Sequence, residues 1–163
     1  MSHIQLPSDE QRFVEDVGLF FERAGSTRMM GRILGWLLIA TPPLQTAENL
    51  ADVLQVSRGA ISTTMRQLVD RALVDRVSLP GQRADYYQIR PGAWAEVLQR
   101  SVALTTQMRL LAERGLALKQ DQPPESRQRL EEMHSMYTFF EERLPQIFAE
   151  WETYWQEHRA QRS

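Results

Sequence analysis

The chain has 163 residues and a mass of 18.9 kDa, a length typical of one domain or of a small domain with a helical extension. Hydrophobic residues make up 42% and charged residues 25%, a balance that excludes a disordered or fibrous chain. The longest apolar run, residues 36–40, is too short to span a bilayer. Without cysteine, disulfides and thiolate metal sites are excluded. The first residues do not resemble a secretory signal, so we expect a cytoplasmic protein without membrane contact.

The net charge of −2 conceals an uneven distribution. Residues 55–90 contain 6 basic and 3 acidic side chains, whereas residues 1–54 contain 4 and 7, and residues 119–163 contain 6 and 9. A local basic patch is what phosphate binding requires. An excess of three charges also arises by chance, so the patch gains weight only from the elements around it.

Two helices are predicted at the N-terminal end. Apolar residues recur at helical spacing over 9–24, and Gly25 is a candidate C-terminal stop. Ser26 or Thr27 is a candidate N-cap for a second helix. That helix ends at Thr41-Pro42-Pro43, because proline cannot continue a helix.

The central segment predicts a short helix, a tight turn, a longer helix and a hairpin. In chain order these elements cover about 47–54, 58–73, 76–79 and 86–89, with Thr46 and Ser57 as N-caps of the two helices. Pro80-Gly81 begins the loop between the strands. This is the order of a winged helix-turn-helix, in which the second helix enters the major groove of DNA.

The longer central helix has an apolar face and a polar face. The apolar positions are Ile61, Met65, Leu68 and Ala72, and the opposite side carries hydroxyls and arginines. Hydroxyls contact phosphates or bases, arginine pairs with guanine, and amides at a helix N-terminus bind phosphate. The candidate DNA-binding residues are Ser57, Arg58, Gly59, Ser62, Thr63 and Arg66 on the helix and Gln82 and Arg83 in the loop. Each candidate also has a structural alternative. The polar face of the helix would then be an ordinary solvated surface, Ser57 would act only as a helix cap, and Arg83 would be a solvated turn residue.

A long helix is predicted from Pro91 to about Lys119, followed by a linker over 121–124 and a final helix. In the final helix the apolar positions alternate steps of three and four: Leu130, Met133, Tyr137, Phe140, Leu144, Ile147, Trp151 and Tyr154. This heptad pattern favours a helix-to-helix seam, either between two copies of the chain or within one core. Pro145 interrupts the pattern, and we expect a kink or a break there.

Three groups of residues resemble the GbsR/MarR-type transcriptional regulators. They are Val14-Glu15-Asp16-Val17-Gly18-Leu19 with Gly25, Arg28, Gly31-Arg32-Ile33 and Gly35-Trp36-Leu37-Leu38; Leu50-Ala51-Asp52-Val53-Leu54-Gln55-Val56-Ser57-Arg58-Gly59-Ala60-Ile61-Ser62; and Pro80-Gly81-Gln82-Arg83 with Tyr86-Tyr87. The similarity covers about residues 14–118. It implies a homodimeric winged-helix protein that binds a palindromic operator in double-stranded DNA, often as a repressor. It also implies that the terminal helices form the dimer interface.

We therefore predict a mainly α-helical fold: a winged helix-turn-helix with a two-stranded β wing, flanked by dimerisation helices. Residues 1–40 would be N-terminal helices that support the core or the dimer. Residues 41–91 would form the DNA-binding region, and residues 92–163 the C-terminal dimerisation helices. Arg28 and Arg32 are expected to pair with acidic residues such as Glu22, or to contact the DNA backbone.

A small-molecule effector is expected for such a regulator. Some members of the group that the sequence resembles are thought to sense quaternary amines, which favour aromatic cages. The candidate effector-binding residues are Trp36, Trp94, Tyr137 and Phe140, with ordinary packing as the alternative.

No enzymatic activity, cofactor or metal is expected. Phosphate-loop, zinc-protease and nucleophile-elbow motifs are absent, and the one Glu131–His134 spacing is too little for a di-iron site. The predicted function is a homodimeric, sequence-specific transcriptional regulator, a repressor under effector control. The alternative is a winged-helix module that binds proteins and not DNA.

Overall fold

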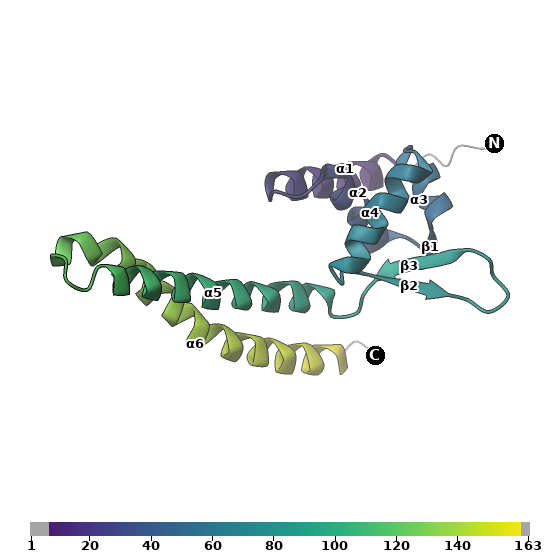
Figure 1. Cartoon of the computed structure of the whole chain (residues 1–163). Helices are drawn as coiled ribbons and strands as arrows, with labels where there is room; N and C mark the ends of the chain where they lie inside the picture. Colours follow the sequence, from purple (N-terminus) through teal and green to yellow (C-terminus); the bar gives the residue numbers. More distant parts are fainter. Residues whose placement is uncertain (1–6, 161–163) are drawn as a thin grey trace. The chain divides into compact units, whose positions relative to one another are not determined.

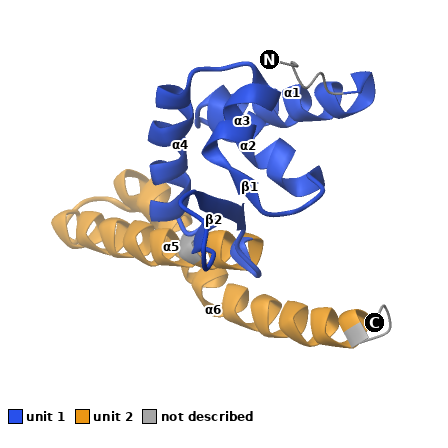
Figure 2. Ribbon diagram, turned by 90° about the vertical axis from the view of Figure 1, so that its right-hand side faces the viewer, with its two compact units in different colours: residues 1–93 blue, residues 94–163 orange. Residues whose placement is uncertain are grey.

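The computed structural model describes residues 7–160 (Figure 1). The chain divides into two compact units, unit 1 (Met1–Ala93) and unit 2 (Trp94–Ser163), which Figure 2 colours separately. In chain order the elements are α1 (Ser8–Arg23), α2 (Arg28–Ile39), β1 (Gln45–Thr46), α3 (Ala47–Leu54), α4 (Arg58–Asp70), β2 (Val74–Ser78), β3 (Asp85–Ile89), α5 (Ala93–Leu118) and α6 (Pro124–Ala160). Within the described range, no helix is both long enough and apolar enough to cross a membrane.

Helices α1 and α2 pack closely through small residues. A Cβ atom on Gly31 would lie 2.6 Å from the carbonyl oxygen of Val17 and 2.8 Å from Cα of Gly18, so only glycine allows this approach. Of the two N-caps predicted for α2, the structure uses Thr27, whose hydroxyl accepts a hydrogen bond from the Met30 amide at 3.2 Å. The N-terminal helices thus form where the sequence predicts them.

The core of unit 1 combines α2, α3 and α4 with the start of β2. Its fully enclosed side chains include Ile33, Leu34, Leu50, Ile61 and Leu68, each 0% exposed. All four positions predicted for the apolar face of the central helix, 61, 65, 68 and 72, are buried. Burial of this face fixes the rotation of α4 and leaves its opposite side to solvent.

The sheet has three strands in the order β1-β3-β2, all antiparallel, and not the two that we predicted. The added strand β1 pairs Gln45 with Tyr87 and Thr46 with Tyr86. Gln45 is buried, and its side chain accepts a hydrogen bond from the Trp36 indole at 3.2 Å and donates one to the Pro42 carbonyl at 2.6 Å. The buried amide therefore joins α2 to the segment that leads into the sheet.

Several boundaries differ from the prediction. Helix α4 ends three residues early, because Ala72 takes a left-handed conformation (φ 57°) that turns the chain into β2. Pro91 does not begin α5, since Gly92 at φ 79° separates it from the helix. Pro145 lies inside α6 and does not break it.

In unit 2, α5 and α6 are joined by a charged cluster. Nε of Arg109 and the hydroxyl of Thr106 both donate hydrogen bonds to the carboxylate of Glu141, the second at 2.9 Å. These bonds, with that of Arg109 the stronger, lower the pKa of Glu141. Ala112 is the only buried apolar residue among the described side chains of this unit. Large apolar side chains of α5 and α6 stay exposed, among them Leu98, Leu104, Leu111, Phe139, Phe140, Ile147, Trp151, Tyr154 and Trp155.

Candidate nucleic-acid interface

A tight turn joins the two helices that build the candidate interface. Gln55 ends α3 in the left-handed conformation (φ 54°, ψ 48°). Ser57 then begins α4, and its hydroxyl accepts a hydrogen bond from the Ala60 amide at 3.2 Å. Thr46 caps α3 in the same way, with the Asn49 amide as donor at 3.1 Å. Both predicted caps are therefore present, and they define where each helix begins.

The solvent side of α4 carries the residues predicted to contact DNA. Arg58, Gly59, Ser62, Thr63 and Arg66 are all exposed. No acidic residue occupies the first turn of α4, so no carboxylate of its own helix offsets the positive end of the helix dipole. The face offers hydroxyl donors, two guanidinium groups and a positive helix end, the groups that bind phosphates and base edges.

The arginines of this region differ in their partners. Arg58 forms an ion pair with Glu48 of α3, and the two side chains are 70% and 63% exposed. Arg66 and Arg83, by contrast, have no carboxylate partner among the residues that the structure describes. Glu48 could not be predicted from the sequence, because the pair joins two helices and has no periodic spacing.

The wing is the loop over 79–84 between β2 and β3. Gly81 provides the turn at φ 76°, and Gln82 and Arg83 are exposed beside it. At the base of the loop Arg76 pairs with Asp85 at 2.5 Å, and Ser78 donates a hydrogen bond to the same carboxylate at 3.2 Å. The hydrogen bond from Arg76 lowers the pKa of Asp85. These contacts hold the two strands together where the loop begins.

A small cleft lies between α4 and the two wing strands, β2 and β3. It is lined by Met65, Arg66, Val69, Asp70, Arg76 and Tyr87. Two guanidinium groups, one from α4 and one from β2, therefore line one cleft. Sequence reasoning missed Arg76, because only the pairing of β2 with β3 places it beside the helix.

Arg28 and Arg32 of α2 have a structural role, because both pair with a carboxylate of α1. Both form ion pairs at 2.7 Å with Glu15 of α1, which takes the place expected for Glu22. Arg32 also donates a hydrogen bond to the Leu54 carbonyl at 2.9 Å, at the end of α3. Burial raises the pKa of Glu15, but the hydrogen bonds and charges of the two arginines outweigh it and lower the pKa below its usual value.

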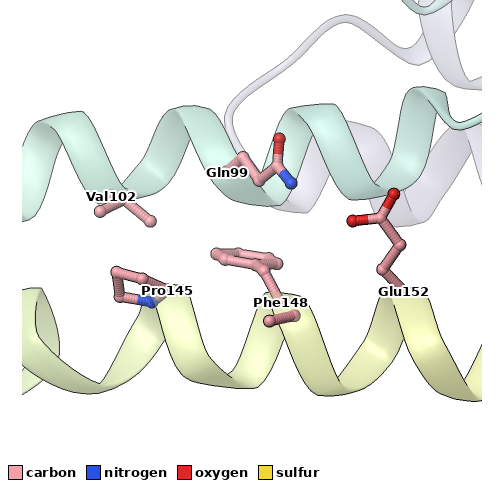
Figure 3. A pocket seen from close by; sticks show the side chains of 6 residues that line it. Gln99, Val102, Pro145, Phe148 and Glu152 are labelled. Carbon is pink, nitrogen blue, oxygen red and sulfur yellow. The ribbon is translucent and has the colours of Figure 1, made fainter.

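The four candidate effector residues belong to different units. Trp36 is in unit 1, partly buried, with its indole N–H already bound to Gln45. In unit 2, Trp94 and Phe140 are 42% and 40% exposed, and Tyr137 is partly buried. A groove of about 390 Å³ between α5 and α6 contains none of these four. Its lining residues are Gln99, Val102, Pro145, Phe148, Ala149 and Glu152, and Figure 3 shows the ring of Phe148 directed towards α5.

Comparison with known proteins decides the family. A family model described as MmpR5-like MarR family transcriptional regulator matches residues 92–154. Over 133 residues the chain is 37% identical to the HTH-type transcriptional regulator MmpR5 of Mycobacterium tuberculosis, an alignment that covers 82% of this chain and 81% of that protein. The chain belongs to the MarR family of transcriptional regulators. A crystal structure described as that of a transcriptional regulator is also similar, with 34% identity, a TM-score of 0.73 and coverage of 89% of this chain and 99% of the other.

Membership of the MarR family confirms the resemblance inferred from the sequence, at the level of the MarR type. The winged-helix fold is that of a DNA-binding regulator, and this MarR-family chain is a regulator and not an enzyme. The predicted mainly α-helical class is confirmed as well, with the third strand as an addition.

Proposed function

We propose that this MarR-family regulator is a homodimer that binds a palindromic operator and represses transcription until a small molecule releases it. The observation that carries the proposal is the exposed polar face of α4, which is held in place by the burial of the opposite face. In this proposal Ser57, Arg58, Gly59, Ser62, Thr63 and Arg66 contact DNA in the major groove. Gln82 and Arg83 of the wing reach the minor groove or a phosphate.

The dimer is supported by the apolar side chains that unit 2 leaves exposed. Ile147, Trp151 and Tyr154 are 54%, 45% and 50% exposed, and they follow the heptad spacing of α6. One recognition helix contacts only a few base pairs, whereas two related by a twofold axis read half-sites about 34–36 Å apart. A second copy would therefore cover the seam and double the number of bases read.

Effector control is supported by the groove between α5 and α6. Part of the lining is apolar, from Val102, Pro145 and Phe148, and Gln99 and Glu152 add polar groups. Such a mixture suits a small amphipathic molecule. The aromatic residues Trp36, Trp94, Tyr137 and Phe140 stay predicted effector contacts, to be tested by ligand titration of single variants.

The test begins with selection of bound duplexes from a random DNA pool, followed by titration of the enriched duplex against salt. We expect an inverted repeat and a steep fall in affinity as salt rises. Arg66→Gln should lower affinity by about 1–3 kcal/mol and relax selection at one position of each half-site. Arg129→Gln, which removes an exposed arginine of α6, is the matched control.

Two outcomes would contradict the proposal. Absence of any enriched sequence, together with binding that Arg66→Gln and Arg129→Gln weaken equally, would favour the alternative of a protein-interaction module. Enrichment of a single half-site by a monomer would contradict the dimer alone. Transcription from a template that carries the enriched site, with and without the protein, decides between repression and activation.

A further inference from the structure

The ion pair between Arg58 and Glu48 lies at the first turn of α4. Arg58 is the first residue of that helix, where its charge adds to the positive end of the helix. Its own helix supplies no acidic residue in the first turn, and the carboxylate comes instead from the first turn of α3. The pair thus places one negative charge at the edge of the surface proposed to face DNA.

An exposed pair of this kind contributes little to stability, because water screens both charges. Its two side chains are 70% and 63% exposed, so the pair mainly affects the binding of charged groups that approach from solvent. A phosphate that approaches Arg58 also approaches the carboxylate of Glu48, which repels it. Arg66 and Arg83 form no ion pair among the described residues, so neither guanidinium is already held by a carboxylate when it meets a phosphate.

The pair with Glu48 affects the contacts of Arg58 to bases and its contacts to phosphates differently. Arginine has five N–H donors, and in the structure Nη2 of Arg58 donates to Glu48. The remaining donors are free to bind the acceptor edge of a guanine while the pair stays intact. Binding to unmatched DNA depends mainly on phosphates, and there Arg58 would have to leave Glu48 or bring the carboxylate close to the DNA backbone.

We propose that Glu48 is a specificity-determining residue of the DNA interface. It positions Arg58 for base contacts on the operator, and it opposes transfer of the guanidinium to phosphates on unmatched DNA. The inference rests on the proposed function, because it needs a chain that distinguishes an operator from other DNA.

The experiment compares Glu48→Gln with the wild-type protein on the selected operator duplex and on a scrambled duplex of the same composition, over a range of salt. On the scrambled duplex we expect about 3- to 10-fold tighter binding and a log–log salt slope steeper by up to about 0.9, the effect of one added phosphate contact. On the operator we expect unchanged or weaker binding. The ratio of the two affinities should therefore fall at least about 3-fold.

Glu131→Gln provides the matched control. Glu131 pairs with Arg127 at 2.8 Å on α6, so this variant also removes one carboxylate from an exposed arginine pair and changes the net charge equally. It should leave the ratio of the two affinities unchanged. Thermal melting of both variants checks that each is folded.

A double-mutant cycle assigns the effect to the pair. In an Arg58→Gln background, Glu48→Gln should no longer lower the ratio, because the guanidinium that it positions is gone. An unchanged ratio in the single variant, or an equal loss with and without Arg58, would overturn the inference. A wild-type protein that binds operator and scrambled duplexes equally at every salt would overturn the proposed function as well.

Discussion

Unit 1 encloses a core of aliphatic side chains, although Phe13 and Phe20 of α1 stay exposed, whereas most of the large apolar side chains described in unit 2 are exposed. In unit 1, Ile33, Leu34 and Ile61 are 0% exposed. In unit 2, Leu111 and Ile147 are 53% and 54% exposed, although they lie on long regular helices. Unit 1 thus completes its core within one chain, and unit 2 forms a helical hairpin whose apolar surface a second copy would complete. In the proposed dimer, the stability of unit 1 would come from one chain, whereas that of unit 2 would depend on protein concentration.

The largest effect is expected from charges placed in the α6 seam. Ile147→Asp combined with Trp151→Asp should raise the dimer dissociation constant at least about 100-fold, because two unpaired carboxylates would be buried at the interface. Sedimentation across a dilution series measures it. Gln146→Asp combined with Gln156→Asp adds the same charges at exposed polar positions of α6 and should leave the dimer intact. Equal dissociation of both double variants would show that the seam is not the interface.

Truncation inside the closed core should be the next largest effect. Ile61→Ala should lower the free energy of unfolding by about 2–5 kcal/mol, since the lost contacts leave a cavity in unit 1. Urea denaturation at two protein concentrations measures the loss. Leu111→Ala removes a side chain that is 53% exposed in unit 2, and its loss should shrink as the protein is diluted. If both losses of stability were independent of protein concentration, the inference that only unit 2 depends on a second copy would be wrong.

Two glycines sharpen the same contrast with a smaller effect. Gly31→Ala should destabilise the protein by about 1–3 kcal/mol, because its Cβ would meet the backbone of α1 at Val17 and Gly18. Gly115→Ala in unit 2 would meet the side chain of Leu130, which can move aside, and the gain in helix propensity offsets part of the cost. Thermal melting should therefore rank Gly31→Ala as clearly the less stable variant. The reverse order would contradict close packing of α1 on α2.

The smallest expected effect is on the stability of the protein at acidic pH. Glu15 in unit 1 and Glu141 in unit 2 have pKa values lowered below the ordinary 4.5. Their contribution to stability is fully present above pH 4.5 and is lost as the pH falls through the lower folded values. Glu15→Gln and Glu141→Gln should each make stability less dependent on pH in this acid range. Melting curves measured against pH, with Glu142→Gln as control, check the expectation.

Local signals explain most of what the sequence could predict. Thr46 and Ser57 each offer a capping hydroxyl before an apolar helical pattern, and both helices begin where these caps predict. Strand β1 was missed because two residues carry no periodic signal, and its pairing depends on β3, some forty residues away. Glu48 and Arg76 were missed for a similar reason. Each matters through a contact with another element, and only the folded chain brings those elements together.

The hydrogen bond from Trp36 to Gln45 has a practical consequence. Trp36 is the one tryptophan of unit 1, and the other three, Trp94, Trp151 and Trp155, belong to unit 2. Indole emission shifts when its hydrogen bonds and its exposure to water change. A Trp36→Phe variant would leave fluorescence from unit 2 alone, and the difference from wild type would give the spectrum of unit 1. The unfolding of each unit can thus be followed by intrinsic tryptophan fluorescence, without attached dyes.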